Sequence, residues 1–340
     1  MLAKHLLSIA LISFFALNSL QAKIWTVAPR PGANFTTLSG AVGSASVSAG
    51  DTILVSGAFT TYAGFTLTKR LTIIGPGYFL DENTNLQADT FSAKVSNIAF
   101  NSGSDGSVIM GLYFVGPVDI NTNNITFTRN RLLITAPYSD GISISANLND
   151  ISITQCYLTL SNVNAYRLIY MTTLDSNIII KNNYLENLST SYGAIVAPSP
   201  FTGSVSNNVI YSASVTRPGV EVHSAIFNNN IIRDGSVTLT SVTPFNNISN
   251  STQFTASNGN QPSISMSAVF VPSGTSDGKW QLAGGSIAIG AGLSGEDCGM
   301  FGGATPYQLS GAPPIPLVYS IDGSIDGTLL YMNVKVKSNN

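Results

Sequence analysis

The chain has 340 residues, of which 44% are hydrophobic and only 9% are charged. A typical soluble domain carries about 25% charged residues, so this composition favours a β-rich protein with a neutral, extracellular type of surface. The formal net charge is −2, and the basic residues are scattered along the chain. This pattern excludes the basic surface that nucleic-acid binding requires.

Residues 1–22 have the pattern of a cleavable signal peptide. Lys4 supplies a positive charge, an apolar stretch runs from Leu6 to Leu17, and Ala22 is a small residue suited to the position before cleavage. An uncleaved membrane anchor is the alternative, but the apolar stretch is shorter than the about 20 residues that a spanning helix needs. We therefore expect a protein that is secreted, or held in the periplasm or at the cell surface, without a membrane segment after cleavage.

The segment after the leader predicts a capped start of a β-rich fold. Thr36–Ala45 can form a short helix over one end of a core, although its small residues weaken this prediction. Gly50–Val55 then predicts the first strand. Leu71–Gly77 and Val108–Phe114 predict further strands in less regular surroundings.

Between residues 125 and 234 the chain repeats itself. Five ten-residue segments begin at Ile125, Ile151, Ile178, Gly203 and Ala225, with spacings of 26, 27, 25 and 22 residues. Their sixth residues are Asn130, Cys156, Asn183, Asn208 and Asn230, and a fainter copy follows at Phe245–Asn247.

The repeat predicts an all-β, right-handed parallel β-helix solenoid. About 25 residues suffice for three short strands and their turns, at about 3.3 Å per strand residue. Alternating residues point inward in such a coil, and like residues stack from coil to coil. We expect these inward pairs at Ile125 and Phe127, Ile151 and Ile153, and Ile178 and Ile180. A β-sandwich or propeller is the alternative, but the repeat is short for a four-stranded blade.

The sixth residues are predicted to form a structural ladder along one edge. Stacked asparagines can hydrogen-bond from one coil to the next. Asparagine also tolerates the left-handed backbone conformation of a tight turn. We expect Cys156 to be a small stacking residue in this row. A disulfide between Cys156 and Cys298 is chemically allowed in a secreted protein, and the sequence leaves their pairing open.

From about residue 263 the repeat fades. Asp297–Pro316 is rich in Gly and Pro and predicts an extended cap or wrap, because proline cannot serve a central strand. Leu329–Lys337 alternates again and predicts a final strand. The expected organisation is a signal peptide over 1–22, a β-helix with an N-terminal helical cap over 23–262, and a C-terminal cap or wrap with a last strand over 263–340.

The chain resembles the pectate-lyase-like superfamily of right-handed parallel β-helix proteins. Gly50-Asp51-Thr52-Ile53 and Lys69–Gly75 are similar to the entry segment of that superfamily, and the tail from Gly299 to Pro316 is similar to the ends of uncharacterised secreted bacterial members. The resemblance implies a fold over residues 23–320. It does not imply an activity, because function depends on a site and not on a scaffold.

The superfamily includes pectate lyases and polygalacturonases, which use clustered acids, so we searched the repeat for such a cluster. Residues at equal offsets from the ladder should be neighbours about 4.8 Å apart, and none of the offsets compared places two carboxylates together. The only histidine beyond the leader, His223, stands in Glu-Val-His-Ser. The sequence therefore predicts no metal site and no cofactor. Calcium remains possible but unsupported.

Two sets of residues remain as candidates for a groove. Arg129, Arg131, Asp140, Arg167 and Lys181 are weak candidates for catalysis, and Tyr166 and Asp175 are weak candidates for binding. Tyr157, Tyr184 and Tyr211 recur after the ladder, where burial is the preferred interpretation over stacking on sugars. Asp150 is interpreted as a turn residue.

Two functions from different classes follow from these observations. The preferred hypothesis is a non-catalytic, monomeric secreted surface or carbohydrate-binding module, whose partner is a polysaccharide or a cell-surface glycan. A structural, adhesin-like element at the cell surface is not separated from it by the sequence. The alternative is a polysaccharide lyase or glycoside hydrolase with an atypical site, which would require the groove candidates to converge.

Overall fold

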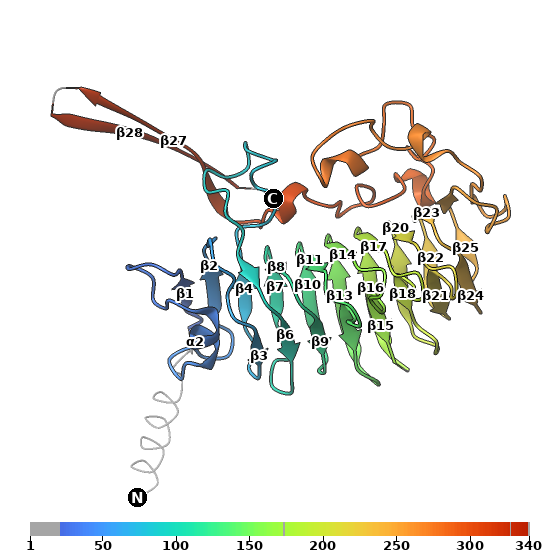
Figure 1. The fold of residues 1–340 in the computed structure, drawn as a ribbon, viewed down its shortest axis with the longest axis horizontal. Helices are drawn as coiled ribbons and strands as arrows, with labels where there is room; N and C mark the ends of the chain where they lie inside the picture. The colour runs from blue at the N-terminus through green and yellow to red at the C-terminus, as the bar shows by residue number, and fades with distance from the viewer. Residues whose placement is uncertain (1–20, 173, 327, 339–340) are drawn as a thin grey trace, which may run out of the picture.

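The computed structural model describes residues 21–172, 174–326 and 328–338. These residues form a right-handed parallel β-helix with three long sheets, A, B and C (Figure 1). Over residues 72–240 the chain visits sheets A, B and C in turn in each coil, whereas in the described residues the first coils lack a strand in sheet B and the last lacks one in sheet C. The predicted fold class is thereby confirmed. Residues 1–20, which hold most of the predicted signal peptide, lie outside the described residues.

Sheet A contains ten parallel strands, one from each coil. In spatial order they are β1 (Ile24–Val27), β2 (Thr52–Val55), β4 (Thr72–Ile74), β7 (Val108–Met110), β10 (Ile125–Thr128), β13 (Asn149–Thr154), β16 (Ser176–Lys181), β19 (Gly203–Ser206), β22 (Ile226–Asn228) and β25 (Pro244–Phe245).

Sheets B and C contain eight parallel strands each. Sheet B consists of β5 (Lys94–Val95), β8 (Tyr113–Phe114), β11 (Arg131–Ile134), β14 (Tyr157–Leu160), β17 (Tyr184–Asn187), β20 (Val209–Ser212), β23 (Ile231–Asp234) and β26 (Ile248–Ser249). Sheet C consists of β3 (Phe65–Leu67), β6 (Ile98–Phe100), β9 (Val118–Ile120), β12 (Ile142–Ile144), β15 (Ile169–Met171), β18 (Ile195–Val196), β21 (Val220–His223) and β24 (Val237–Thr240).

The interior is a stack of aliphatic and aromatic side chains in register. Ile125 pairs with Ile151, and Ile151 pairs with Ile178. All six residues predicted to point inward are fully buried. The predicted strand register is therefore confirmed, and burial of these rows is the main stabilising contribution to the coils.

The ladder residues form one row between sheets A and B, as predicted, and the structure shows that this row is buried. The Asn208 side-chain oxygen accepts the Asn183 backbone N–H and side-chain amide at 3.0 Å each, and Asn208 donates to Ile180 O at 2.9 Å and to Asn230 at 3.0 Å. Asn247, in the fainter copy of the repeat, continues the same row, and Asn260 extends it beyond the predicted copies. A last parallel bridge joins Ile248 and Gln261.

One detail of the ladder prediction is wrong. The left-handed residue of the turn between sheets A and B is the one before each ladder residue, not the ladder residue itself. The left-handed residues are Arg129, Gln155, Asn182, Asn207, Asn229 and Asn246, with φ between 52° and 57°. The ladder residue is selected because its side chain reaches the neighbouring coil.

The two cysteines do not pair. Both are free and buried. The Cys156 sulfur takes the place of a ladder oxygen and accepts the Asn130 N–H at 3.4 Å, while the Cys298 thiol donates to Asn246 O at 3.2 Å. Burial raises the pKa of each thiol to about 12.

The first coil is covered by the predicted helix. Helix α2 (Leu38–Gly43) begins after Thr37, whose hydroxyl accepts the Gly40 N–H at 3.2 Å. Leu38, Ala41 and Val42 are buried against the end of the core. At the other end, Phe254 joins the interior beside Phe227.

The segment after the last coil, residues 263–315, is a wrap that runs back along the outer face of sheet B (Figure 1). It contains the short 3₁₀ helices η1 (Met266–Ala268), η2 (Gly278–Trp280), η3 (Leu293–Gly295) and η4 (Leu309–Gly311). Tyr157, Tyr184 and Trp280 stack at 4.5 and 4.7 Å between ring centroids. Tyr157 and Tyr184 are thus buried packing residues, as the sequence analysis preferred.

The left-handed residues hold this wrap in antiparallel order. The Arg129 side chain donates to Ala312 O at 2.8 Å, Asn182 donates to Gly302 O at 2.7 Å, and Asn246 donates to Ala291 O at 2.8 Å. Between these points Gln155 donates to Pro306 O and Asn207 donates to Asp297 O, while Asn229 accepts the Leu293 N–H. One side-chain row therefore fixes the tail to most of the solenoid.

The predicted final strand is half of a hairpin. β27 (Pro316–Asp326) pairs antiparallel with β28 (Leu329–Ser338), and the hairpin extends away from the body of the molecule (Figure 1). In the described part of the chain, no helix is long and apolar enough to cross a membrane.

Candidate functional site

The five residues considered for one catalytic groove lie on different parts of the β-helix. Arg129 is fixed under the wrap: besides its bond to Ala312, its Nε donates to Gln155 Oε1 at 3.0 Å. Burial lowers the pKa of Arg129. The contacts of this side chain are those of a structural residue.

Arg131, at the start of β11, lies in a separate cleft. Its guanidinium carbon is 4.1 Å from the Phe79 ring centroid and 4.2 Å from that of Tyr113. The cleft has a volume of about 640 Å³ and is also lined by Asp81, Glu82, Lys94 and Ser276. Both carboxylate oxygens of Glu82 already accept hydrogen bonds from Ser276 within the protein.

Lys181 and Asp175 do not line the cleft at Arg131. Lys181 ends β16 on sheet A, in register with Thr154. Asp175 lies in the turn between sheets C and A, is 3% exposed, and accepts the Leu148 N–H at 2.9 Å. Burial raises the pKa of Asp175. A binding role for this carboxylate would require it to be exposed, so the structure favours a turn-stabilising role.

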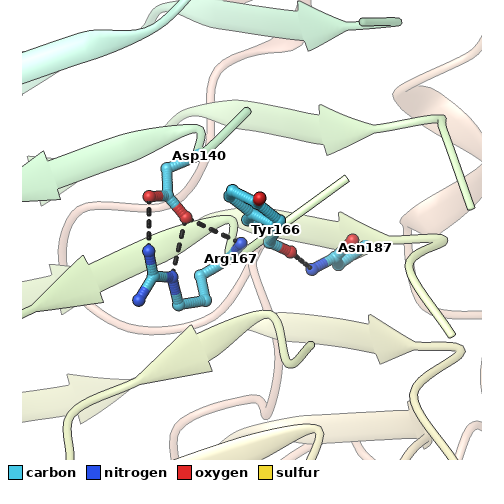
Figure 2. A network of polar contacts seen from close by, with 4 residues as sticks. All are labelled: Asp140, Tyr166, Arg167 and Asn187. Atoms are coloured by element: carbon cyan, nitrogen blue, oxygen red, sulfur yellow. Dashed lines mark hydrogen bonds and ion pairs between the residues drawn. The ribbon is translucent and has the colours of Figure 1, made fainter. Parts of the chain in front are cut away.

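Asp140 and Arg167 do come together, at the turns that lead into β12 and β15 of sheet C (Figure 2). Asp140 Oδ1 accepts from the Arg167 backbone N–H at 2.9 Å and from Nε at 2.8 Å, while Oδ2 accepts from Nη2 at 2.7 Å. Burial by itself would lower the pKa of Arg167, but the hydrogen bonds and charge of Asp140 raise it. This bidentate pair fixes the guanidinium over the Tyr170 ring, 3.6 Å from its centroid.

A row of tyrosines follows the same edge of sheet C over three consecutive coils. The centroids of Tyr138 and Tyr166 are 6.0 Å apart, and those of Tyr166 and Tyr192 are 5.2 Å apart. Tyr138 is 67% exposed, and Tyr166 and Tyr192 are half-buried. We call these three residues the tyrosine row.

Asn187, fully buried at the end of β17, positions this row. Its Nδ2 donates to Tyr166 O at 2.9 Å, to Tyr192 O at 3.1 Å and to Gly193 O at 2.8 Å, and Figure 2 shows the first of these bonds. One amide therefore fixes the backbone of two adjacent turns. The rings project from a rigid edge, which reduces the entropy lost when a ligand binds.

A cleft of about 280 Å³ adjoins the tyrosine row. Arg167, Tyr170, Tyr192 and Arg217 line it together with Val196, Pro198, Pro218 and Glu221. Arg217 is exposed, its guanidinium carbon is 5.2 Å from the Tyr192 centroid, and it forms no ion pair with any described acid. The cleft thus joins aromatic and apolar walls to a guanidinium that is free to donate.

Glu221 and Asp119 supply the nearest carboxylates on the outer face of sheet C. Glu221 Oε1 lies 3.6 Å from His223 Nε2. Asp119, on β9, is in register with Ser143, which is in register with Tyr170. Burial and the charge of Asp140 raise the pKa of Asp119. The charge of Asp140 therefore acts on Asp119, an interaction that no offset in the repeat indicated.

Among the described residues, no group of three His, Cys, Asp or Glu side chains comes together as a metal site would need. The donors at the tyrosine row and its cleft are two guanidiniums and the tyrosine hydroxyls, and the acceptors include the carboxylate of Asp140, already bound to Arg167, and that of Glu221. This set suits a neutral or partly anionic polar ligand with an apolar face.

Tyr138, Tyr170, Tyr192, Arg217 and Asn187 were not identified as site residues from the sequence. The tyrosine row follows its ladder residues by eight, ten and nine positions, because the turn between sheets B and C varies in length. A search at fixed offsets therefore misses the row. A search that allowed the offset to vary by two positions could have found the row, because a tyrosine follows the ladder residue by eight to ten positions in each of these three coils.

No protein-family model, curated protein or solved structure matches the chain. The site is therefore interpreted from its own geometry.

Proposed function

We propose that the protein is a secreted or cell-surface carbohydrate-binding module, and that it binds a polysaccharide or cell-surface glycan along the tyrosine row. The observation that carries this proposal is the row itself, with three partly exposed rings on successive coils beside a cleft that holds a free guanidinium. The module acts as a monomer after removal of its leader.

The chemistry of the row fits a sugar chain. A pyranose presents an apolar face of C–H groups, which can pack on an aromatic ring and remove apolar surface from water. Its hydroxyls can accept hydrogen bonds from Arg217 and from the tyrosine hydroxyls. Successive coils repeat these contacts along the axis, so an extended polymer can engage several rings.

The test is binding of the mature protein to an immobilised panel of plant, microbial and animal glycans. Tyr138→Ala and Tyr192→Ala should each weaken binding about three- to tenfold, because an aromatic contact contributes about 0.5–1.5 kcal/mol. Tyr331→Ala is the matched control, because this tyrosine is 54% exposed but lies on the hairpin. Absence of any glycan ligand, or equal affinity of all variants, would contradict the proposal.

The second candidate is a glycoside hydrolase that uses Asp119. The favouring observation is the position of Asp119 on the outer face of sheet C, where burial and the charge of a second carboxylate, Asp140, raise its pKa, because glycoside hydrolases use a pair of carboxyl groups. Release of reducing ends from a bound glycan, lost in Asp119→Asn but not in Asp234→Asn, would support it. Intact glycan after prolonged incubation leaves the binding module as the function.

A further inference from the structure

Asp51 is a buried carboxylate in the turn that leads into β2. It is 2% exposed. Its Oδ2 accepts the Trp25 indole N–H and the Ser48 N–H at 2.8 Å each, and its Oδ1 accepts the Lys23 backbone N–H at 2.8 Å. Burial by itself would raise the pKa of Asp51, but these hydrogen bonds and the charge of Lys23 lower it below the usual value. The carboxylate is therefore held in its charged form.

A buried charge usually has a partner of opposite sign. No described Lys or Arg side chain forms an ion pair with Asp51. The nearby cations are directed elsewhere: Lys69 Nζ donates to Ser44 O and Val47 O, Arg70 packs against Gly50, and the Lys23 ammonium lies 5.9 Å from the Trp25 ring centroid. The carboxylate thus has three N–H donors and no described cation in direct contact, although the charge of the Lys23 side chain acts on it from a longer distance.

The donor to Oδ1 is the nitrogen that directly follows the predicted end of the leader. Cleavage after Ala22 adds water across the Ala22–Lys23 peptide bond: hydroxide joins the Ala22 carbonyl carbon, and the Lys23 nitrogen gains protons and becomes an α-ammonium. The same atom then carries a positive charge 2.8 Å from Asp51 Oδ1. Lys23 is also fixed by the Thr52 N–H, which donates to its carbonyl at 2.8 Å.

We propose that Asp51 is the receiving site for the amino terminus produced by cleavage between Ala22 and Lys23, and that the resulting ion pair closes the first coil only in the processed protein. The inference rests on the proposed export of the chain and not on glycan binding. Before cleavage the Lys23 amide is neutral, and the carboxylate lacks this counter-ion. Processing therefore completes the start of sheet A, where β1 is the edge strand.

Two forms of the protein, one beginning at Lys23 and one beginning at Ala22, test the position of this charge, because in the second form the α-ammonium lies on Ala22 and the Lys23 nitrogen is a neutral amide. Both are released from the same cleavable fusion, and they differ by one residue. The Lys23 form should melt about 2 °C higher at pH 6.5, since about 1 kcal/mol shifts the melting temperature by about 2–4 °C in chains of about 150–250 residues and by less in longer ones. Asp51→Asn should remove the difference between the two forms, because the asparagine carries no charge.

The pH dependence gives a second readout. The partner carboxylate raises the α-amino pKa above its unfolded value of about 7.7–8.0, so the stabilisation is full below that value and is lost as the pH rises through the folded pKa. The charged groups around Asp51 are the Lys23, Lys69 and Arg70 side chains, which both forms share. The difference in melting temperature should therefore vanish above about pH 10.

The third measurement does not require any variant to fold. Intact mass of the chain exported with its own leader should place the first residue at Lys23. An amine-acylating reagent at pH 7 should modify this α-amine at least tenfold more slowly in native than in denatured protein. A different first residue, equal reactivity, or a difference in melting temperature that persists in Asp51→Asn would overturn the proposal, and glycan binding at the distant tyrosine row would be unaffected.

Discussion

The asparagine ladder makes the energetic role of a single side chain measurable. Asn208 is fully buried and forms four side-chain hydrogen bonds, to the Asn183 N–H, the Asn183 amide, Ile180 O and Asn230. In Asn208→Ala the Asn183 N–H loses its acceptor, and Ile180 O loses this donor. Each buried polar group left without a partner costs about 1–3 kcal/mol, so the variant should be destabilised by about 2–6 kcal/mol.

One coil carries Cys156 in place of the ladder asparagine, so the effect of a weaker hydrogen-bonding side chain at this position can be compared within the same protein. The Cys156 sulfur accepts from Asn130 at 3.4 Å and donates to Phe127 O at 3.5 Å, which are weaker bonds than those of an amide. Cys156→Asn should therefore join the two parts of the ladder and stabilise the protein by about 1 kcal/mol. Asn208→Cys should fall between wild type and Asn208→Ala.

Thermal unfolding gives the rank order, and hydrogen exchange locates the effect. Coils of a solenoid contact only their neighbours, so local opening need not unfold the whole chain. Asn208→Ala should increase exchange of the Asn183 amide far more than exchange of amides in the first coils. Unchanged melting together with a protected Asn183 amide would refute the ladder as a source of stability.

Three further predictions follow from burial and from the acids at the site. Ile180→Asp buries an unpaired charge in the core and should lower the free energy of unfolding by several kcal/mol. The control Ile179→Asp lies on the outer face of the same strand and should have a melting temperature near that of wild type. Equal melting temperatures of the two variants would disprove the register. Cys156 and Cys298 should resist a thiol reagent at pH 8 in native protein and react fully in denaturant, since burial raises their pKa to about 12; rapid native labelling would contradict this. Polygalacturonate with calcium should give no unsaturated product by ultraviolet absorbance, because calcium favours several carboxylates at one place; a signal abolished by chelation would reverse the prediction.

The parts of the fold that repeat were predictable from the sequence, and the reason is geometric. A side chain at a given place in one coil contacts its equivalent in the next, so Ile125, Ile151 and Ile178 are subject to the same selection and appear as a period. The turn at Asp150 was also predictable, and its φ of 59° is the conformation that aspartate tolerates at turns. Even the helical cap was found, over a slightly longer range than Leu38–Gly43.

The wrap was predictable only as an irregular segment. Its path depends on long-range contacts, such as Arg129 to Ala312 across 183 positions, and no period in residues 263–315 encodes them. The residues that indicate a covering segment lie in the coils of the solenoid, directly before the ladder residues. Most residues that precede the ladder are asparagines with side chains available for bonding, and asparagine in a left-handed turn can donate to a passing backbone.

The path of the wrap also explains why the candidate site lies on sheet C. The wrap covers much of the outer face of sheet B beyond the cleft at Arg131, and the aromatic residues between them, such as Tyr184 and Trp280, stack on one another and not on a ligand. Tyrosines on sheet C have no such cover: Tyr138 and Arg217 are exposed beside the cleft. The same residue type is therefore packing on one face and a candidate contact on the other. Because the difference arises from the distant tail, it could not be read from the spacing of tyrosines within the repeat.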